Sequence, residues 1–285
     1  MKLHLTRKVN RSFGGTAALF ILLLIAAVFT ALPMVLTVGN AFKPMDELWI
    51  FPPKLLPVSP TLKNFRDMMV VMNTSWVPFT RYLFNTVFIT VAGTAGHIIL
   101  ASLCAYPLAK KKFPGKSVIF NMIVLALMFN ATVTAIPNYI LMAKLHWIDS
   151  YLALIVPAFA SPMGLYLMKQ FMEQIPDSLL EAARIDGASG WKIFWQIVMP
   201  NVKSAWLTLM LLSVQSLWNM GASSFIFKEE LKTRAYAIGQ IMAGGIARAG
   251  VGAAVSVVMM VIPIGIFIFT QSNVIETMSS SGLKD

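Results

Sequence analysis

Charged residues are scarce in this chain, and their scarcity identifies the broad class of protein. Of 285 residues, 12% are charged and 57% are apolar, whereas soluble domains carry about twice that charged fraction. Six stretches contain no Asp, Glu, Lys or Arg at all: 12–42, 82–109, 117–143, 150–168, 204–227 and 249–275. Each is near or beyond the roughly 20 residues that cross a bilayer as a helix. We therefore expect an all-α integral membrane protein with six transmembrane helices.

The length of these stretches and the order of apolar and polar residues within them exclude two other architectures. Core helices of a soluble protein are rarely so long and so free of charge. The strands of a membrane β-barrel alternate apolar and polar residues, and these stretches do not. A seventh apolar segment, 235–247, is Gly-rich and too short to span. We expect it to form an interfacial or re-entrant helix.

Cysteine is almost absent, and the first apolar stretch lacks the features of a cleaved leader. Cys104 is the one cysteine, so an internal disulfide is excluded. It falls inside the second predicted helix, where we expect it to pack as a small hydrophobic residue. Basic residues precede 12–42, as in a signal peptide, but the stretch is longer than the 7–15 residues of an h-region. We expect a retained membrane anchor.

Acidic residues are also few, which leaves a formal net charge of +11. Such a charge could attract nucleic acid, but the Lys and Arg residues gather at the ends of apolar stretches, where they fix membrane topology. These residues include Lys2, Arg7, Lys8, Arg11, Lys110, Lys111, Lys112, Lys116, Lys169, Arg184, Lys192 and Lys203. They fall on one side if every stretch spans once. We predict that this side is the cytoplasm, with both termini inside, 46–80 outside, and no nucleic-acid partner.

The chain lacks the motifs of an enzyme. No Gly-x-x-x-x-Gly-Lys-Ser/Thr nucleotide-binding loop occurs, and no Ser/His/Asp arrangement or metal-ligand spacing stands out. We expect no catalytic residues, no metal and no cofactor. His97 lies alone in the middle of the second stretch, where a buried and hydrogen-bonded histidine is favoured over a proton relay or a metal ligand.

One polar segment between apolar stretches carries the most specific pattern. Pro176 suits the first turn of a helix, and Asp177 places an acid near its positive end. Gly187 provides a turn, and a second helix follows. Two apolar stripes are expected, each on one helix face: Ile175, Leu179 and Ala183 in the first helix, and Trp191, Phe194, Trp195 and Val198 in the second. An amphipathic helical hairpin beside a membrane predicts a docking partner.

This segment resembles the EAA loop of binding-protein-dependent ABC importer permeases. The matching residues are Glu181, Ala182, Ala183, Gly187, Ile197 and Pro200, while Met199 replaces the family's usual Leu. Further matches to carbohydrate importers, and to the second permease subunit of the maltose type, run from Arg81 to the C-terminus. They include Tyr82–Thr86, Ala105-Tyr106, Phe113–Lys116, Ile136–Tyr139, Ile148–Ser150, Trp218-Asn219 and the Gly282-Leu283-Lys284 ending. The last outer loop differs from the family pattern, because here Thr233 is followed by Arg234-Ala235, whereas the family often has Leu-Pro at these positions.

The resemblance implies a fold, a division of the chain and a set of partners. The fold is the type I importer permease fold, with an anchor helix and outer loop in 1–80, the transmembrane domain in 81–272 with the EAA loop at 173–200, and a cytoplasmic tail in 273–285. The partners are a second permease subunit, two ATPase subunits that hydrolyse ATP, an extracytoplasmic solute-binding protein and the lipid bilayer of a bacterial plasma membrane. The residues implied to couple to the ATPase are Glu181, Ala182, Ala183, Asp186, Gly187 and Pro200.

Polar side chains within the spans are candidates for the solute path. A sugar needs amides, hydroxyls and aromatic faces, and the candidates are Asn130, Asn138, Gln215, Ser216, Trp218 and Asn219. Hydrogen bonding between helices is an equally good explanation for each of them. We interpret the chain as one permease subunit of a sugar importer. Two alternatives stay open: an importer of another solute, such as an amino acid or polyamine, and a membrane scaffold without transport.

Overall fold

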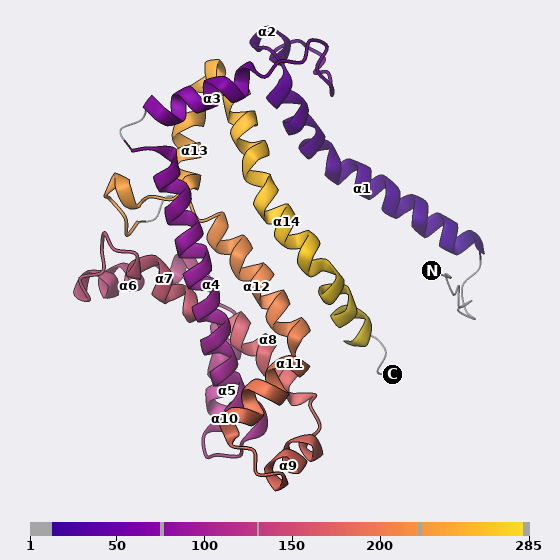
Figure 1. Cartoon of the computed structure of the whole chain (residues 1–285), viewed down its shortest axis with the longest axis vertical. Coiled ribbons are helices and arrows are strands. Elements are labelled where there is room, and N and C mark those ends of the chain that lie inside the picture. Colours follow the sequence, from indigo (N-terminus) through magenta and orange to yellow (C-terminus); the bar gives the residue numbers. More distant parts are fainter. Residues whose placement is uncertain (1–12, 75–76, 130, 222–223, 282–285) are drawn as a thin grey trace. The chain divides into compact units, whose positions relative to one another are not determined.

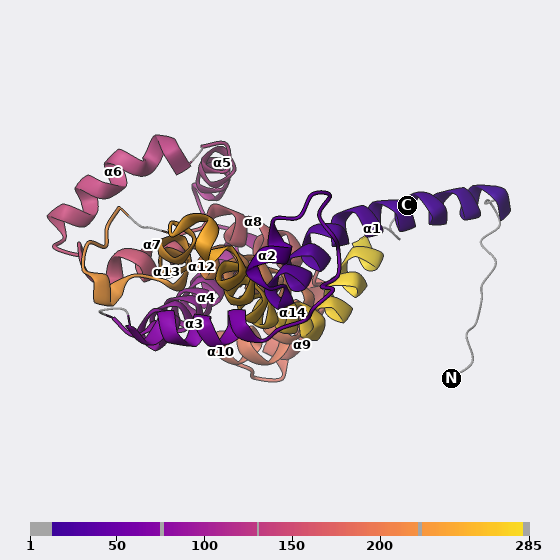
Figure 2. The ribbon, with the colours of Figure 1, turned by 90° about the horizontal axis from the view of Figure 1, so that it is seen from above.

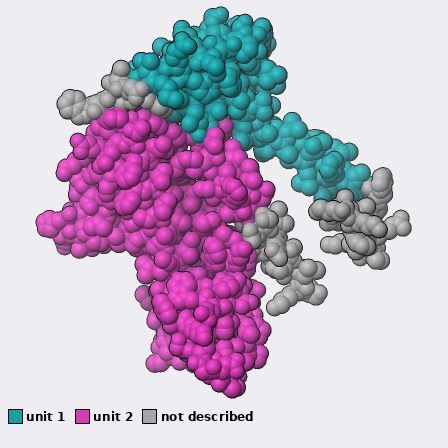
Figure 3. Space-filling model, in the orientation of Figure 1, with its two compact units in different colours: residues 1–71, 241–258 teal, residues 72–240, 259–285 magenta. Residues whose placement is uncertain are grey.

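The structure is a computed structural model that describes residues 13–74, 77–129, 131–221 and 224–281. Every regular element within these ranges is a helix (Figure 1). Two compact units divide the chain, coloured separately in Figure 3: residues 1–71 with 241–258, and residues 72–240 with 259–285. The predicted all-helical class is confirmed.

The first unit contains α1 (Phe13–Phe42), α2 (Met45–Leu48) and most of α3 (Lys63–Thr74), together with the 3-10 turn Gly245–Arg248 and the start of α14 (Ala249–Ser281). Buried polar groups fix its long loop. The Glu47 carboxylate accepts hydrogen bonds from the backbone N–H groups of Val58 at 2.7 Å and Ser59 at 3.3 Å. The Asn64 side-chain amide donates to the carbonyls of Ala41 at 3.0 Å and Lys43 at 2.7 Å. These hydrogen bonds hold the loop in place.

The second unit is built around one long helix, α4 (Phe79–Lys110), which packs against α7 (Leu152–Phe159), α8 (Pro162–Glu173) and α12 (Lys203–Trp218). Glycines allow the close contacts. A Cβ at Gly96 would strike the Phe159 ring, and a Cβ at Gly164 would strike the His97 ring. His97 itself is buried and its Nδ1 lies 2.7 Å from Ser213 Oγ. Helix packing through small residues is typical of membrane bundles.

Within the residues that the structure describes, four helices are long and apolar enough to cross a membrane: Gly14–Phe42, Phe79–Lys110, Leu152–Glu173 and Ala249–Gln271. A fifth is possible if Gly190–Asn201 and Lys203–Trp218, which meet at 76°, count as one bent span. The predicted third span instead forms two shorter helices, α5 (Lys116–Ala126) and α6 (Ala131–Lys144). Figure 2 looks nearly along α5, whereas α6 lies across the view. The structure thus supports four to five apolar spans.

The close contact at Gly164 generates a stability prediction. We expect Gly164→Ala to destabilise the purified protein by about 1–3 kcal/mol, because the added methyl group overpacks the contact with His97. Thermal unfolding in detergent measures the effect. Gly265→Ala is the matched control, since a Cβ there meets nothing within 4 Å. Equal melting temperatures for the two variants would contradict the proposed close packing of α4 and α8.

Candidate functional site

The segment with the Glu-Ala-Ala pattern folds as short helices around a glycine turn. Helix α9 (Asp177–Ile185) follows Pro176, and Gly187 has a φ of +80°, a conformation that L side chains rarely adopt. The chain continues through α10 (Gly190–Ile193), a π-helical turn at Phe194–Val198 and α11 (Met199–Asn201). The Ser189 side chain accepts a hydrogen bond from the Lys192 N–H at 3.3 Å and so caps α10.

One side of this segment is buried against the spans. Leu180 and Ala183 of α9, with Ile193, Phe194 and Val198 further on, join a cluster that includes residues of α4, α8 and α12. The cluster members from those helices are Ala101, Ala105, Met168, Met172, Ala205 and Leu209. The segment is therefore packed onto the helices that would cross the membrane.

The two predicted stripes are only partly buried. Leu179 is 42% exposed, and Trp191 and Trp195 are 64% and 38% exposed. Ile175 lies before α9 begins, so it does not set the register of that helix. In the second helix, Phe194 and Val198 at the two ends of the π-helical turn are buried, whereas Trp191 lies in α10, before that turn begins.

The opposite side of the segment is open. Five of the six residues with an implied coupling role are exposed: Glu181, Ala182, Asp186, Gly187 and Pro200. Ala183 is buried in the cluster. Glu181 makes no hydrogen bond or ion pair with any part of the chain that the structure describes, and Ile185 beside it is 86% exposed. An unpaired acid next to exposed apolar side chains is a composition that suits an interface.

Lys110, the last residue of α4, fastens this segment at its start. Its side chain is 6% exposed, and its ammonium lies 2.8 Å from the Asp177 carboxylate. The same ammonium donates to the carbonyl of Glu173 at 3.2 Å and to that of Ile175. These carbonyls belong to the last residue of α8 and to a residue just after it, where helical partners are lacking. The lysine holds the pKa of the Asp177 carboxyl below its usual value.

A second candidate site is a cavity of about 540 Å³ among α4, α6, α7 and α12. Its polar lining consists of uncharged groups and one histidine: His97, Asn138, Ser161, Ser213, Ser216 and Ser224. Phe225 provides an aromatic wall and stacks on Tyr139 with ring centroids 6.3 Å apart. Hydroxyls, an amide and an aromatic face are groups that recognise small polar solutes.

The candidate path residues divide between this cavity and other places. Asn138 and Ser216 line it, whereas Trp218 is buried at 2% exposure beneath the Arg234 guanidinium. Asn219 is exposed and accepts a hydrogen bond from Arg234 at 3.2 Å, and Gln215 is exposed on the same helix. Asn130 lies outside the described residues. The serines at 161, 213 and 224 were missed, because a serine in an apolar stretch carries no distinguishing sequence signal.

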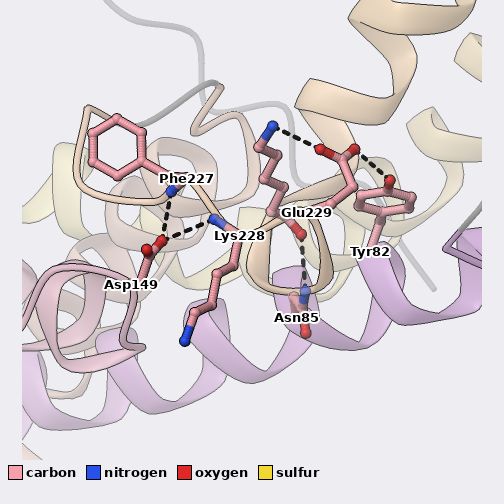
Figure 4. Close-up of polar contacts among 7 residues, drawn as sticks. Tyr82, Asn85, Asp149, Phe227, Lys228 and Glu229 are labelled. Atoms are coloured by element: carbon pink, nitrogen blue, oxygen red, sulfur yellow. Dashed lines mark hydrogen bonds and ion pairs between the residues drawn. The ribbon is translucent and has the colours of Figure 1, made fainter.

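A polar network at the other end of α4 was not predicted either (Figure 4). Glu229 accepts a hydrogen bond from the Tyr82 hydroxyl at 2.7 Å and pairs with the Lys232 ammonium at 2.7 Å. Asn85 donates to the carbonyls of Glu230 at 2.8 Å and Lys232 at 2.9 Å. The network binds the loop 228–234 to the first turns of α4. The charged loop and the Tyr82–Thr86 match were visible in the sequence, but their pairing was not.

Asp149 holds the preceding part of that loop. Its Oδ1 accepts hydrogen bonds from the backbone N–H groups of Phe227 at 2.6 Å and Lys228 at 2.9 Å, as Figure 4 shows. Its own N–H donates to the Phe225 carbonyl at 2.9 Å. The hydrogen bond from Lys228 is the main reason that the pKa of this carboxyl is lowered.

No metal site is found in the described part of the chain, which contains no group of three or more His, Cys, Asp or Glu residues suited to an ion. Comparison with known proteins gives a positive result. The family model of the binding-protein-dependent transport system inner membrane component matches residues 97–277. This chain belongs to that family, and it is thus a multi-pass inner-membrane component of a transport system.

Several relatives and solved structures are similar to the chain. It is 32% identical over 190 residues to Protein LplC of Bacillus subtilis, covering 67% of this chain and 62% of that protein. It is 38% identical over 142 residues to the sn-glycerol-3-phosphate transport system permease protein UgpE of Yersinia enterocolitica, covering 50% of each. The chain therefore spans about half to two thirds of these curated relatives.

The solved structures support the fold. A bacterial ABC transporter involved in the import of the acidic polysaccharide alginate matches with a TM-score of 0.79 at 24% identity, covering 94% of this chain and 99% of the matched one. The alginate transporter in complex with its pentasaccharide-bound periplasmic protein matches with a TM-score of 0.62 at 15% identity, covering 90% and 91%.

The hydrogen bonds that Asp149 accepts from Phe227 and Lys228 lead to a prediction about amide hydrogen exchange in this loop. We expect Asp149→Ala to increase amide hydrogen exchange across 225–232 at least severalfold at pH 7, because two backbone donors lose their acceptor. Asp149→Asn keeps an oxygen acceptor and should show a smaller increase. Since the pKa of Asp149 is depressed, its stabilisation is present above about pH 4 and is lost as the pH falls further. Unchanged protection in the Ala variant would refute this anchoring role.

Proposed function

We propose that this chain is a permease subunit of a bacterial ATP-driven sugar importer, coupled to a cytoplasmic ATPase through residues 173–200. The observation that carries the proposal is the two-sided geometry of that segment. Leu180, Phe194 and Val198 are buried against the spanning helices, while Glu181 and Ile185 face outward without partners in the described chain. A segment of this kind can transmit movement from a docked protein to the membrane helices.

The remaining partners follow from the family and from what the chain lacks. The family description names dependence on a binding protein, and the alginate transporter was solved with a periplasmic protein. We propose an extracytoplasmic solute-binding protein, a second permease subunit and two ATPase subunits. The chain has no nucleotide-binding loop, so ATP hydrolysis is assigned to the ATPase subunits, and this subunit is no enzyme.

The coupling mechanism uses the segment as a lever. ATP binding closes the ATPase pair, and each docked segment moves with its ATPase. Because the segment shares an apolar cluster with α4, α8 and α12 and is tied to α4 by Lys110, those helices must follow. The cavity then changes its access from one side of the membrane to the other, as in rigid-body switching between two packed states.

We further propose six spans, with the broken α5–α6 segment as the third and both termini in the cytoplasm. Helix breaks inside a membrane are tolerated where the freed backbone lines a cavity. Asn138 of α6 lines the cavity described above, which supports this assignment.

The chemistry of the cavity favours a neutral polyhydroxylated solute. Its lining offers hydroxyls, one amide and the Phe225 ring, and it contains no Asp, Glu, Lys or Arg. An anionic or cationic solute would be bound without charge compensation there. This lining disfavours the other solutes that the sequence left open, a cationic polyamine or an amino acid. Binding measurements on the partner solute-binding protein distinguish them: affinity for a neutral sugar supports the proposal, and affinity restricted to polyamines or amino acids overturns it.

We predict that Glu181→Ala and Gly187→Pro each abolish ATP-driven uptake while the protein still reaches the membrane. We propose that Glu181 pairs with a basic group of the docked ATPase, and breaking one side of such a buried ion pair costs about 3–5 kcal/mol. Proline cannot adopt the positive φ of Gly187. Uptake in whole cells and ATPase stimulation by loaded binding protein are the measurements. Gln196→Ala, at an exposed position of the same segment, is the control and should transport normally. Wild-type uptake in both test variants would sink the coupling role.

We also predict that 46–80 faces the outside and the Lys110–Lys116 turn faces the cytoplasm. The basis is the clustering of basic residues at one end of the spans. Single cysteines introduced in a Cys104→Ala background, at Ser59 and at Pro114, can be labelled with a membrane-impermeant maleimide. Labelling from outside at 59 only is the expected result, and labelling from outside at 114 would overturn the topology.

A further inference from the structure

A groove between α5 and α8 has an apolar body and a basic end, and the proposed transport mechanism uses neither. The apolar part is a pocket of about 700 Å³ lined by residues of α4, α5, α7 and α8. Its α5 lining is Ile119, Met122, Ile123 and Ala126, and Leu165 of α8 faces them. The lining contains no charged residue and one hydroxyl, that of Ser161.

The basic end is a second pocket of about 470 Å³, which Lys116 of α5 and Lys169 of α8 line together with Phe113, Gly115 and Phe120. Lys169 is 8% exposed and its ammonium lies 3.9 Å from the centroid of the Phe120 ring. Lys169 also pairs with Glu173 at 2.8 Å, and Lys116 donates to the Ala109 carbonyl at 3.4 Å. With Glu173 included, the groups at this end sum to one positive charge.

The two pockets follow one another along the same pair of helices. Leu165 lines the apolar pocket and Lys169, one helical turn later, lines the basic one. On α5 the lining runs from Lys116 to Ala126, which is about 15 Å at 1.5 Å per residue. That length equals about half of the 30 Å hydrocarbon core, the depth of a single leaflet.

We propose that this groove binds an anionic phospholipid, with the headgroup phosphodiester between Lys116 and Lys169 and an acyl chain along Ile119, Ile123 and Leu165. The charge of the basic end complements one phosphodiester, and basic pockets between membrane helices are typical sites for anionic headgroups. The acyl chain fills the apolar pocket over the depth of its leaflet. The lipid joins α5 to α8 and so supports the helix that leads into the cavity-lining α6.

The chain offers its own reporter for this site, because Cys104 lines the apolar pocket and is its one cysteine. The full chain would be reconstituted in nanodiscs of phosphatidylcholine with or without phosphatidylglycerol. Retained lipid is measured by native mass spectrometry, and Cys104 accessibility by its labelling rate with a membrane-permeant maleimide.

Phosphatidylglycerol is expected to be retained in preference to phosphatidylcholine and to slow Cys104 labelling. Lys116→Gln should weaken retention about fivefold, since one lysine near the bilayer surface contributes about 1 kcal/mol to anionic lipid binding. Lys116 is half-buried at the start of α5, so the variant should fold. Lys111→Gln, an exposed position in the same turn that does not line the pocket, is the matched control and should bind as the wild type does.

Ile123→Trp tests the apolar half, because it fills the groove and leaves both lysines in place. It should release the lipid and keep Cys104 protected. Equal retention in the wild type and Lys116→Gln, or equal protection by both lipids, would refute the proposal. The proposal would also be refuted if Cys104 became protected only on assembly with the second permease, whatever lipid is present. That result would assign the groove to a helix of the second permease.

Discussion

The packing of α4 against α7, α8 and α12 is the constraint on which the second unit depends. Gly96 and Gly164 let the helices approach until Phe159 and His97 fill the space that a Cβ would occupy. In a bilayer, apolar side chains gain little by leaving lipid, so close van der Waals contact and satisfied polar groups must hold the helices together. The buried pair of His97 and Ser213 is such a polar contact.

Helix α4 also joins two distant polar sites. At its start, Tyr82 and Asn85 bind the loop 228–234, and at its last residue, Lys110 binds Asp177 at the beginning of α9. The whole helix has 32 residues, which corresponds to about 48 Å. A movement that tilts α4 at one end must therefore displace the loop at the other, which gives a direct physical link between the two faces of the subunit.

The sequence predicted the helical class, four to five of the six apolar spans and the glycine turn at Gly187, because each depends on local composition or on one backbone requirement. Sequence-based prediction was less successful where the regular α-helical geometry is interrupted. The second helix of the segment contains a π-helical turn at Phe194–Val198, and the break between α5 and α6 divides an uninterrupted apolar stretch. Neither feature has a compositional signal.

The candidate sites show the same limit. Asn138 and Ser216 reach the cavity, but Trp218 is buried beneath Arg234, a residue sixteen positions away in the chain. Contacts of that range are decided by tertiary packing, which a single sequence does not reveal. The residues of the open face around Glu181 could be predicted from the sequence, because they belong to the Glu-Ala-Ala pattern. The contacts of the buried face could not be predicted, because its partners lie on α4, α8 and α12.

The central claim is that the face around Glu181 docks on an ATPase. Thiol cross-linking in the assembled importer tests it most directly, with Glu181→Cys in the Cys104→Ala background and a matching cysteine in the ATPase cleft. The account predicts a cross-link to the ATPase at 181 and none from a cysteine at Lys228, in the loop assigned to the opposite side of the membrane. Cross-linking at 228, or none at 181 in an importer that still transports, would contradict it.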